Sequence, residues 1–294
     1  MLARSAGLAV GALLAPRASL LRASPLGSAV GLQLYAVKDE LRADPARVLQ
    51  AIRQIGFGEV ETAGLAGMSA AEFRKLLDDA NLRCPSAHLQ FDAANLQPAF
   101  EQAHTLGAHY ATSGSLREVL AAAAAREGRA APAPVGAMSR DEARRTAELA
   151  NHIGERARQA GLQYAYHNHA FEFAAASGAT AYDLLLRETD PQLVQFEIDC
   201  GWMVLGGRDP RAYFERYPGR FPMIHVKDFL PAAAHGSEHP GAELGHGMID
   251  YGPIFAAAAR SGLKHYFAEQ EGPFTRMTEL DAARQAYDYL SNLH

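Results

Sequence analysis

The chain has 294 residues, of which 48% are hydrophobic and 21% are charged, and this balance excludes the disordered and membrane-spanning classes of protein. Its formal charge of −5, without a run of Lys or Arg, gives no positive surface for a polyanion, so nucleic acid is not an expected partner. The length suits one large domain, because parallel barrels commonly take about 250 residues as a single unit.

The first 28 residues differ in character from the rest. Arg4 precedes an apolar run over residues 6–15, and Pro16 and a region of small residues follow it. These features are typical of a secretory signal peptide, and the run is too short to span a bilayer. We therefore expect residues 1–28 to be a signal peptide that directs the protein to the periplasm or out of the cell. The alternative is a disordered extension on a cytoplasmic protein, and in neither case does the mature protein insert into a membrane.

From residue 30 onward, short stretches typical of β-strands alternate with longer helical patterns. This alternation favours βαβ units around a parallel sheet, and eight such units can be counted. We expect strands at residues 30–34, 59–61, 84–88, 110–113, 163–168, 194–199, 223–227 and 266–269. The predicted fold class is α/β, a single-domain (β/α)8 TIM barrel over residues 29–294.

Helix start and stop signals lie between these strands. Ser69 with Glu72, and Ser139 with Glu142, have the spacing of a capping box, in which each side chain binds a free backbone N–H of the first turn. Glycines follow helical patterns where a helix C-cap is expected, at positions 56, 107, 161 and 262.

Two segments interrupt the regular spacing, at residues 116–138 and 230–248. Each follows the C-terminal end of an expected strand, the side on which barrels place their functional loops. Both are candidate lids. His235 and His239 in the second segment could equally be solvated loop residues.

Polar side chains finish the last four strands. The C-terminal ends of parallel barrel strands converge on one mouth, so residues there are candidates for a site. Successive strands end with His167, Asp199, His225 and Glu269. Two carboxylates and two imidazoles form a mixed set that suits Mn²⁺, Zn²⁺, Co²⁺ or Fe²⁺, whereas Mg²⁺ prefers more oxygen ligands.

Several phrases of the sequence carry a family resemblance. They are Gly-Phe-Gly-Glu-Val-Glu at 56–61, Tyr-His-Asn-His-Ala-Phe-Glu-Phe at 166–173, Glu-Ile-Asp at 197–199, His-Val-Lys-Asp at 225–228 and Gly-His-Gly-Met-Ile-Asp at 245–250. Together they resemble the sugar phosphate isomerase/epimerase group of the xylose-isomerase-like TIM barrel superfamily. The resemblance runs from about residue 30 to the C-terminus.

The resemblance implies one divalent metal ion, Mn²⁺ first among the candidates, held by Glu, Asp, His and Glu in chain order. Asp199, His225 and Glu269 match this series, but His167 stands where the first glutamate is usual. His167 could bind the metal as a neutral imidazole, or His169 could take its place.

The resemblance also implies a divalent-metal-dependent sugar isomerase or epimerase that works through an enediolate intermediate. We expect Glu269 to remove the carbon-bound proton, with His167 or His169 acting on the other face. Lys227 could neutralise the enediolate or bind an anionic group. For this lysine a structural ion pair is an equal alternative.

Further strand-end residues are candidates for contact with a small carbohydrate substrate: Gln33, Tyr35, Glu61, His88 and Trp202. The open alternatives are a structural ion pair for Glu61 and core packing for Trp202. Glu172 and Asp228 are expected to orient the neighbouring histidines and lysine.

Two other functions compete with the isomerase. A 3-keto-glycoside lyase or hydratase would use the same metal-assisted enolisation and then release a β-leaving group. A non-catalytic sugar-binding barrel would have lost its metal, which the presence of Asp199, His225 and Glu269 argues against. The sequence leaves a homo-oligomer open as a further possibility.

Overall fold

The computed structural model of the protein describes residues 27–126, 128, 136–174, 178–231, 241–272 and 277–293. Apart from its last two residues, the expected signal peptide lies outside the described residues, as do His235 and His239. In the part of the chain that is described, no helix combines the length and the apolar character needed to cross a membrane.

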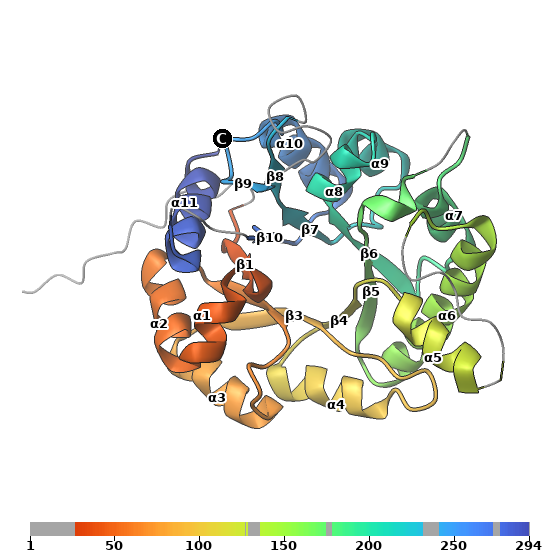
Figure 1. The fold of residues 1–294 in the computed structure, drawn as a ribbon, viewed down its shortest axis with the longest axis horizontal. Coiled ribbons are helices and arrows are strands. Elements are labelled where there is room, and N and C mark those ends of the chain that lie inside the picture. The colour runs from red at the N-terminus through yellow and green to blue at the C-terminus, as the bar shows by residue number, and fades with distance from the viewer. Residues whose placement is uncertain are drawn as a thin grey trace, which may run out of the picture.

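Eight parallel strands close into a barrel, and helices surround it (Figure 1). The strands are β1 (Gly31–Gln33), β2 (Glu59–Ala63), β3 (Arg83–His88), β4 (Tyr110–Ser113), β5 (Gln163–His167), β6 (Val194–Asp199), β7 (Met223–Val226) and β10 (His265–Ala268). Strand β1 pairs with β2 on one side and with β10 on the other, where Gly31 lies opposite Phe267 and the ring closes. The predicted (β/α)8 TIM barrel is confirmed, and each strand begins and ends within two residues of its expected position.

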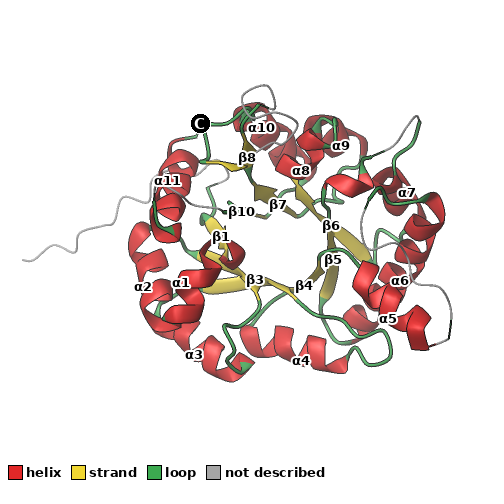
Figure 2. Ribbon diagram, viewed as in Figure 1, coloured by secondary structure: helices red, strands yellow, loops and turns green. Residues whose placement is uncertain are grey.

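The helices lie between the strands in chain order (Figure 2). They are α1 (Lys38–Ala43), α2 (Pro45–Ile55), α3 (Ala70–Asp79), α4 (Gln97–Leu106), α5 (Arg117–Arg126), α6 (Arg140–Gln159), α7 (Ala181–Glu188), α8 (Cys200–Leu205), α9 (Pro210–Arg216), α10 (Tyr251–Ser261) and α11 (Glu279–Asn292), with 3₁₀ turns η1 (Leu34–Val37) and η2 (Ala170–Glu172). The capping box at Ser69 and Glu72 is formed. The second box is formed only in part: Ser139 caps α6, but the Glu142 carboxylate binds Arg117. The first candidate lid, at residues 116–138, contains helix α5.

The inside of the barrel is layered, because side chains alternate between the two faces of each strand. A small apolar cluster lies inside, formed by Tyr110, Ala165, Met223 and Phe267. Two positions further along β5, β7 and β10 come His167, His225 and Glu269, on the same inner face and one layer nearer the C-terminal mouth. The apolar layer thus forms a floor beneath a polar one.

A glycine permits this floor to form. A Cβ atom at Gly31 would lie 2.5 Å from the Phe267 ring and 2.7 Å from the Tyr266 carbonyl oxygen. Any larger residue would push Phe267 out of the barrel interior. Gly31 therefore allows β1 and β10 to approach closely where the ring closes.

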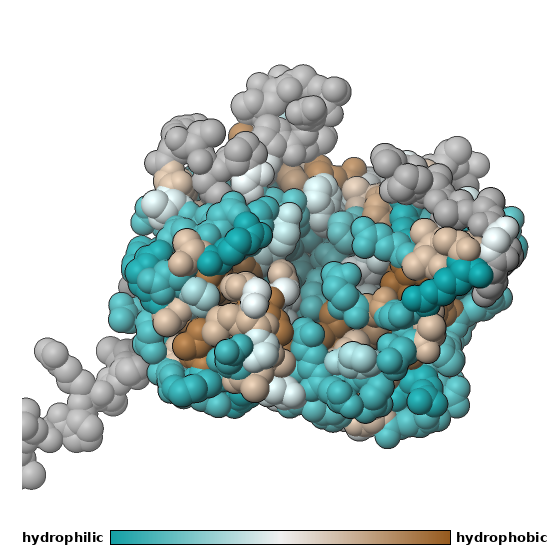
Figure 3. Space-filling model, turned by 60° about the horizontal axis from the view of Figure 1, so that its bottom comes forward, coloured by the Kyte–Doolittle hydropathy of each residue, from teal (hydrophilic) through white to brown (hydrophobic). Residues whose placement is uncertain are grey.

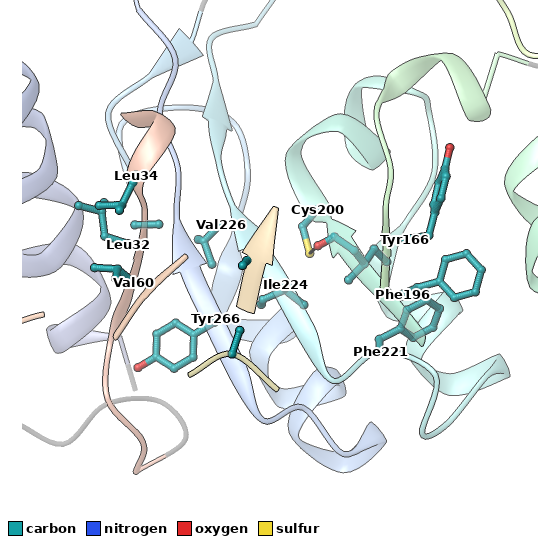
Figure 4. Packing of buried hydrophobic residues seen from close by; sticks show 14 of the residues in the cluster. Leu32, Leu34, Val60, Tyr166, Phe196, Cys200, Phe221, Ile224, Val226 and Tyr266 are labelled. Atoms are coloured by element: carbon teal, nitrogen blue, oxygen red, sulfur yellow. Dashed lines mark hydrogen bonds between the residues drawn. The ribbon is translucent and has the colours of Figure 1, made fainter. Parts of the chain in front are cut away.

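The outward-facing side chains of the strands pack against the helices. Figure 4 shows Phe196 of β6 beside Phe221, with Ile224 and Val226 of β7 in the same core. The Phe196 and Phe221 ring centroids are 6.3 Å apart. On the face drawn in Figure 3, hydrophilic residues cover most of the described surface and hydrophobic residues show in smaller patches between them.

The segment after β7 is anchored by Asp228. Strands β8 (Asp228–Phe229) and β9 (Gly241–Ala242) pair antiparallel beside the barrel. The Asp228 carboxylate accepts hydrogen bonds from the backbone N–H groups of Gly245, Gly247 and Ile249, at 3.3, 3.0 and 3.1 Å. The prediction that Asp228 orients Lys227 is therefore wrong, because its oxygens hold this loop instead.

Candidate metal centre and adjoining cavity

Four strand-end side chains meet at the mouth of the barrel. One ligand atom from each of His167, Asp199, His225 and Glu269 lies within 4.8 Å of the others, and all four residues are buried. His225 Nδ1 lies 2.8 Å from Glu269 Oε2 and 3.9 Å from Asp199 Oδ2. The structure thus brings together the four residues that the sequence proposes as metal ligands. Metal binding itself stays a prediction.

The hydrogen bonding of the Asp199 carboxylate indicates whether this cluster fits a cation. Its Oδ1 accepts a hydrogen bond from the Trp202 backbone N–H at 2.8 Å, which caps α8. Its Oδ2 is buried and has no hydrogen-bond partner among the described residues. The Lys227 ammonium lies 3.4 Å from this oxygen, beyond the length of a good hydrogen bond to it. A buried carboxylate oxygen without a hydrogen bond is costly, and a directly bound cation would satisfy it. The mixed nitrogen and oxygen donors fit a divalent transition metal.

Lys227 supplies the positive charge nearest to this cluster. Its side chain is 2% exposed, and Nζ lies 3.1 Å from Glu269, 3.4 Å from Asp199 and 2.6 Å from Glu271. Burial lowers the pKa of Lys227, but the charges of Glu269, Asp199 and Glu271 outweigh this and hold it above its ordinary value. Burial in turn raises the pKa of Glu269, and Lys227 and His225 more than reverse the shift. Both groups are therefore charged, and Glu269 is available as a ligand or a base.

Two further carboxylates hold His225 from the other side. His225 Nε2 lies 2.7 Å from Glu61 Oε2 and 3.2 Å from Glu197 Oε2. Such a carboxylate fixes the ring orientation of a metal-binding histidine. The sequence reasoning gave Glu197 no role, although it stands two residues before Asp199 and so on the same inner face of β6.

His88 completes the network around Glu197. Its Nε2 lies 2.8 Å from Glu197 Oε2 and 3.3 Å from Glu61 Oε2. Burial lowers the pKa of His88, but the two carboxylates outweigh it and raise the pKa to about 10. His88 is thus a cation, paired across the barrel with a residue of β6.

A family model for the xylose isomerase-like TIM barrel matches residues 49–293. The chain belongs to the xylose isomerase-like TIM barrel family. The resemblance that the sequence motifs predict is confirmed.

Several similar proteins have named functions. Inosose dehydratase of Lacticaseibacillus casei is 34% identical over 164 residues, which are 51% of this chain and 54% of that protein. The chain therefore spans about half the length of the curated relatives it matches. A sugar phosphate isomerase/epimerase from Parabacteroides distasonis has a solved structure with a TM-score of 0.69 and 26% identity, covering 90% of this chain and 93% of that one.

A xylose isomerase-like TIM barrel protein from Mycobacterium smegmatis, solved in complex with magnesium, has a TM-score of 0.62 and covers 92% of this chain and 97% of that one. Its identity is 18%, so it shows a shared fold only.

A cavity of about 1190 Å³ lies beside the cluster of candidate ligands, because its wall includes His88 and His169, whose rings lie 5.2 and 5.0 Å from the His167 ring. Four of the residues proposed for chemistry or substrate contact line it: Tyr35, His88, His169 and Trp202. Trp202 also packs on Phe229, with ring centroids 5.1 Å apart. Lys227 Nζ lies over the Trp202 ring, 4.8 Å from its centroid.

His167 and His169 occupy different places. His167 belongs to the ligand cluster, whereas His169 lines the cavity. The geometry therefore favours His167 over His169 as the fourth ligand. Burial and the nearby Lys227 lower the pKa of His169 to about 4, so its imidazole is neutral at pH 7. Glu172 accepts the His169 backbone N–H at 2.9 Å, which fixes this segment.

Glu61 and Gln33 lie beneath the cavity rather than in its wall. They are 0% and 1% exposed. Gln33 Nε2 donates to Glu61 Oε2 at 2.7 Å, and the Ser86 hydroxyl donates to Glu61 Oε1. In this structure both residues support His225, and the ion-pair alternative for Glu61 matches its position.

Proposed function

We propose that this barrel is a divalent-metal-dependent isomerase or epimerase that moves a proton next to the carbonyl of a carbohydrate. One observation carries the proposal: His167, Asp199, His225 and Glu269 converge, and one buried Asp199 oxygen among them accepts no hydrogen bond. The similarity to a sugar phosphate isomerase/epimerase, at 26% identity over 90% of this chain, supports it.

The four strand-end residues would hold the metal ion. Mn²⁺ is the ion we expect, and Zn²⁺, Co²⁺ and Fe²⁺ are alternatives that suit the same donors. A bound divalent ion acts as a Lewis acid that polarises the substrate carbonyl. His225 is oriented to bind the ion, because Glu61 and Glu197 hold the ring nitrogen that faces away from Glu269.

The residues around the cluster can carry out the proton transfer. Glu269 is ionised and 6% exposed, so its carboxylate can accept a proton from the carbon next to the carbonyl. Lys227, 3.1 Å from Glu269, stabilises the negative charge that develops on the substrate oxygen. His169 in the cavity wall can exchange a proton on the other face. Acid–base assistance of this kind contributes about 10²–10⁴-fold to rate.

Exchange of substrate hydrogen for solvent deuterium tests the proposal. Free ketoses and 3-keto-glycosides are incubated in D₂O with Mn²⁺ and the full chain, and Glu269→Gln is compared with wild type. We expect exchange next to the carbonyl that falls at least about 100-fold in the variant. Undiminished exchange in Glu269→Gln would remove Glu269 as the base. Purified protein without bound metal, and without a response to Mn²⁺, would favour the sugar-binding barrel.

A lyase or hydratase is the second candidate, favoured by the similarity to inosose dehydratases. The first step is the same removal of a proton from the carbon next to the carbonyl. The electron pair then forms a C=C bond while the C–O bond at the β-carbon breaks. The departing oxygen keeps its electron pair and takes a proton, leaving as water or an alcohol. Chromatography with mass detection separates the two candidates, because elimination gives a product lighter by the departing water or alcohol, whereas isomerisation leaves the mass unchanged.

A further inference from the structure

The cavity beside the metal cluster is larger than a single sugar requires. Its volume is about 1190 Å³, whereas pockets for small ligands commonly measure about 300–1,000 Å³. It extends from His88 and His169, whose rings lie 5.2 and 5.0 Å from the His167 ring, to helix α5. A sugar placed at the cluster therefore leaves the part beside α5 unfilled.

The part beside α5, which we call the apolar arm, has a different chemistry from the end at the cluster. The apolar residues that line it are Leu89, Phe91, Leu116, Val119, Ala122 and Phe171. These residues come from the segment after β3, from α5 and the residue before it, and from η2. Phe171 stacks on His169 at 5.5 Å with an angle of 12° between the rings, so the arm begins directly at the proposed site. Apolar and aromatic walls of this kind bind apolar groups.

The arginines that line the cavity are engaged by acidic partners. Arg117 binds the Glu142 carboxylate at 2.5 Å and lies 4.0 Å above the Phe171 ring. Arg126 makes two hydrogen bonds to Asp92, at 2.6 and 3.0 Å. A phosphate group would require cations that are free to pair with it. The cavity therefore favours a neutral apolar group over a sugar phosphate.

We propose that the apolar arm binds a flat apolar aglycone, so that the substrate is a glycoside rather than a free or phosphorylated sugar. The placement of the sugar at the metal cluster rests on the proposed function above. The aglycone would contact Phe91, Leu116, Phe171 and Ala122, which line the arm.

Binding measurements test the arm without any turnover. Isothermal titration of the full chain compares 4-methylumbelliferyl and methyl glycosides of glucose, galactose and xylose, with glucose 6-phosphate as the anionic probe. We expect one of the aryl glycosides to bind at least about tenfold more tightly than its methyl counterpart, because an aromatic ring buries about 150–250 Å². Glucose 6-phosphate should bind no better than the methyl glycosides.

A matched pair of variants on α5 assigns the effect to the arm. Ala122 lines the cavity and Ala125 does not, and both are exposed on the same helix. Ala122→Glu should remove the preference for the aryl glycoside, while Ala125→Glu should retain it. Neither variant is expected to disturb folding, which circular dichroism checks.

Three results would overturn the proposal that the arm binds an aglycone. They are equal affinity for aryl and methyl glycosides, no binding of any aryl glycoside, or an aryl preference that survives Ala122→Glu. Deuterium exchange, measured separately, distinguishes this failure from that of the proposed function. Exchange without aryl preference rejects only the arm. Aryl preference without exchange rejects only the enolising activity.

Discussion

Two buried carboxylates in the polar layer of the barrel differ in how their oxygens are satisfied. Glu61 on β2 has a partner for each oxygen, supplied by Gln33, Ser86 and His225. Asp199 on β6 leaves Oδ2 without a hydrogen bond, with the Lys227 ammonium 3.4 Å away as an ion partner, although the residue is equally buried. Buried polar atoms are nearly always hydrogen-bonded, so an exception calls for a ligand or a strained role.

Within one layer of the barrel, Glu61 therefore supports a neighbouring side chain, whereas Asp199 is a candidate metal ligand. The satisfied carboxylate belongs to the first strands of the chain and fixes a histidine. The unsatisfied one belongs to the later strands, where the predicted metal ligands gather. Substitutions in the two places should therefore have unequal effects on metal binding.

Asp199→Asn should give the largest effect. Loss of the carboxylate removes a ligand charge, and we expect bound metal to disappear and turnover to fall at least about 1,000-fold, since a bound metal ion contributes several kcal/mol. Elemental analysis and the deuterium-exchange assay measure both quantities. Asp250→Asn is the control, because Asn also caps a helix well. Retention of metal in Asp199→Asn would remove the distinction between the two carboxylates.

Lys227→Met should destabilise the metal-free protein next most strongly. Removal of the ammonium leaves the buried Asp199 and Glu269 carboxylates with His225 as their remaining partner, which costs about 3–5 kcal/mol of unfolding free energy. Added Mn²⁺ should recover part of this loss, because a divalent ion compensates the same carboxylates. Urea unfolding with and without Mn²⁺ measures it, and the exposed Lys264→Met is the control. A loss that Mn²⁺ does not reduce would argue against the metal site.

Glu61→Gln should weaken metal binding by about 10–100-fold, the range found when the partner of a metal-binding histidine is removed. The fold should persist, since Gln has the same shape. Competition with a chelator measures the affinity. An effect as large as that of Asp199→Asn would place Glu61 among the ligands rather than behind them.

Ser86→Ala should have the smallest effect on metal binding. It removes one donor to Glu61, so we expect about 1.5–3 kcal/mol less unfolding free energy, the range for a hydrogen bond to a charged group. Metal affinity should change by less than Glu61→Gln changes it, because His225 keeps its carboxylate partner. Thermal unfolding and the same chelator competition test both expectations.

The barrel and the meeting of the four proposed ligands could be predicted because their signals are local. Strand patterns and helix caps are read within a few residues, and closure of a parallel barrel then brings the strand ends together. The role of Glu197 could not be predicted in this way. Its pairing with His88 joins β6 to β3 across the interior, and such a contact depends on the stagger of the whole ring.

Local signals also misled where a distant partner competed. Glu142 has the spacing to complete a capping box with Ser139, yet its carboxylate binds Arg117. That arginine belongs to α5, in the segment expected to be a lid. A buried guanidinium needs a carboxylate more than an exposed helix end does. The shape of the cavity beside α5 follows from such contacts and was out of reach of the sequence.

The pairing of Gly31 with Phe267 also has a consequence for synthesis of the protein. Strand β1 can pair with β10 only after residue 268 has left the ribosome. Until then the nascent chain carries two open sheet edges, at β1 and β7, which can pair with other chains. Nearly the whole polypeptide must therefore be protected from aggregation before the barrel can close.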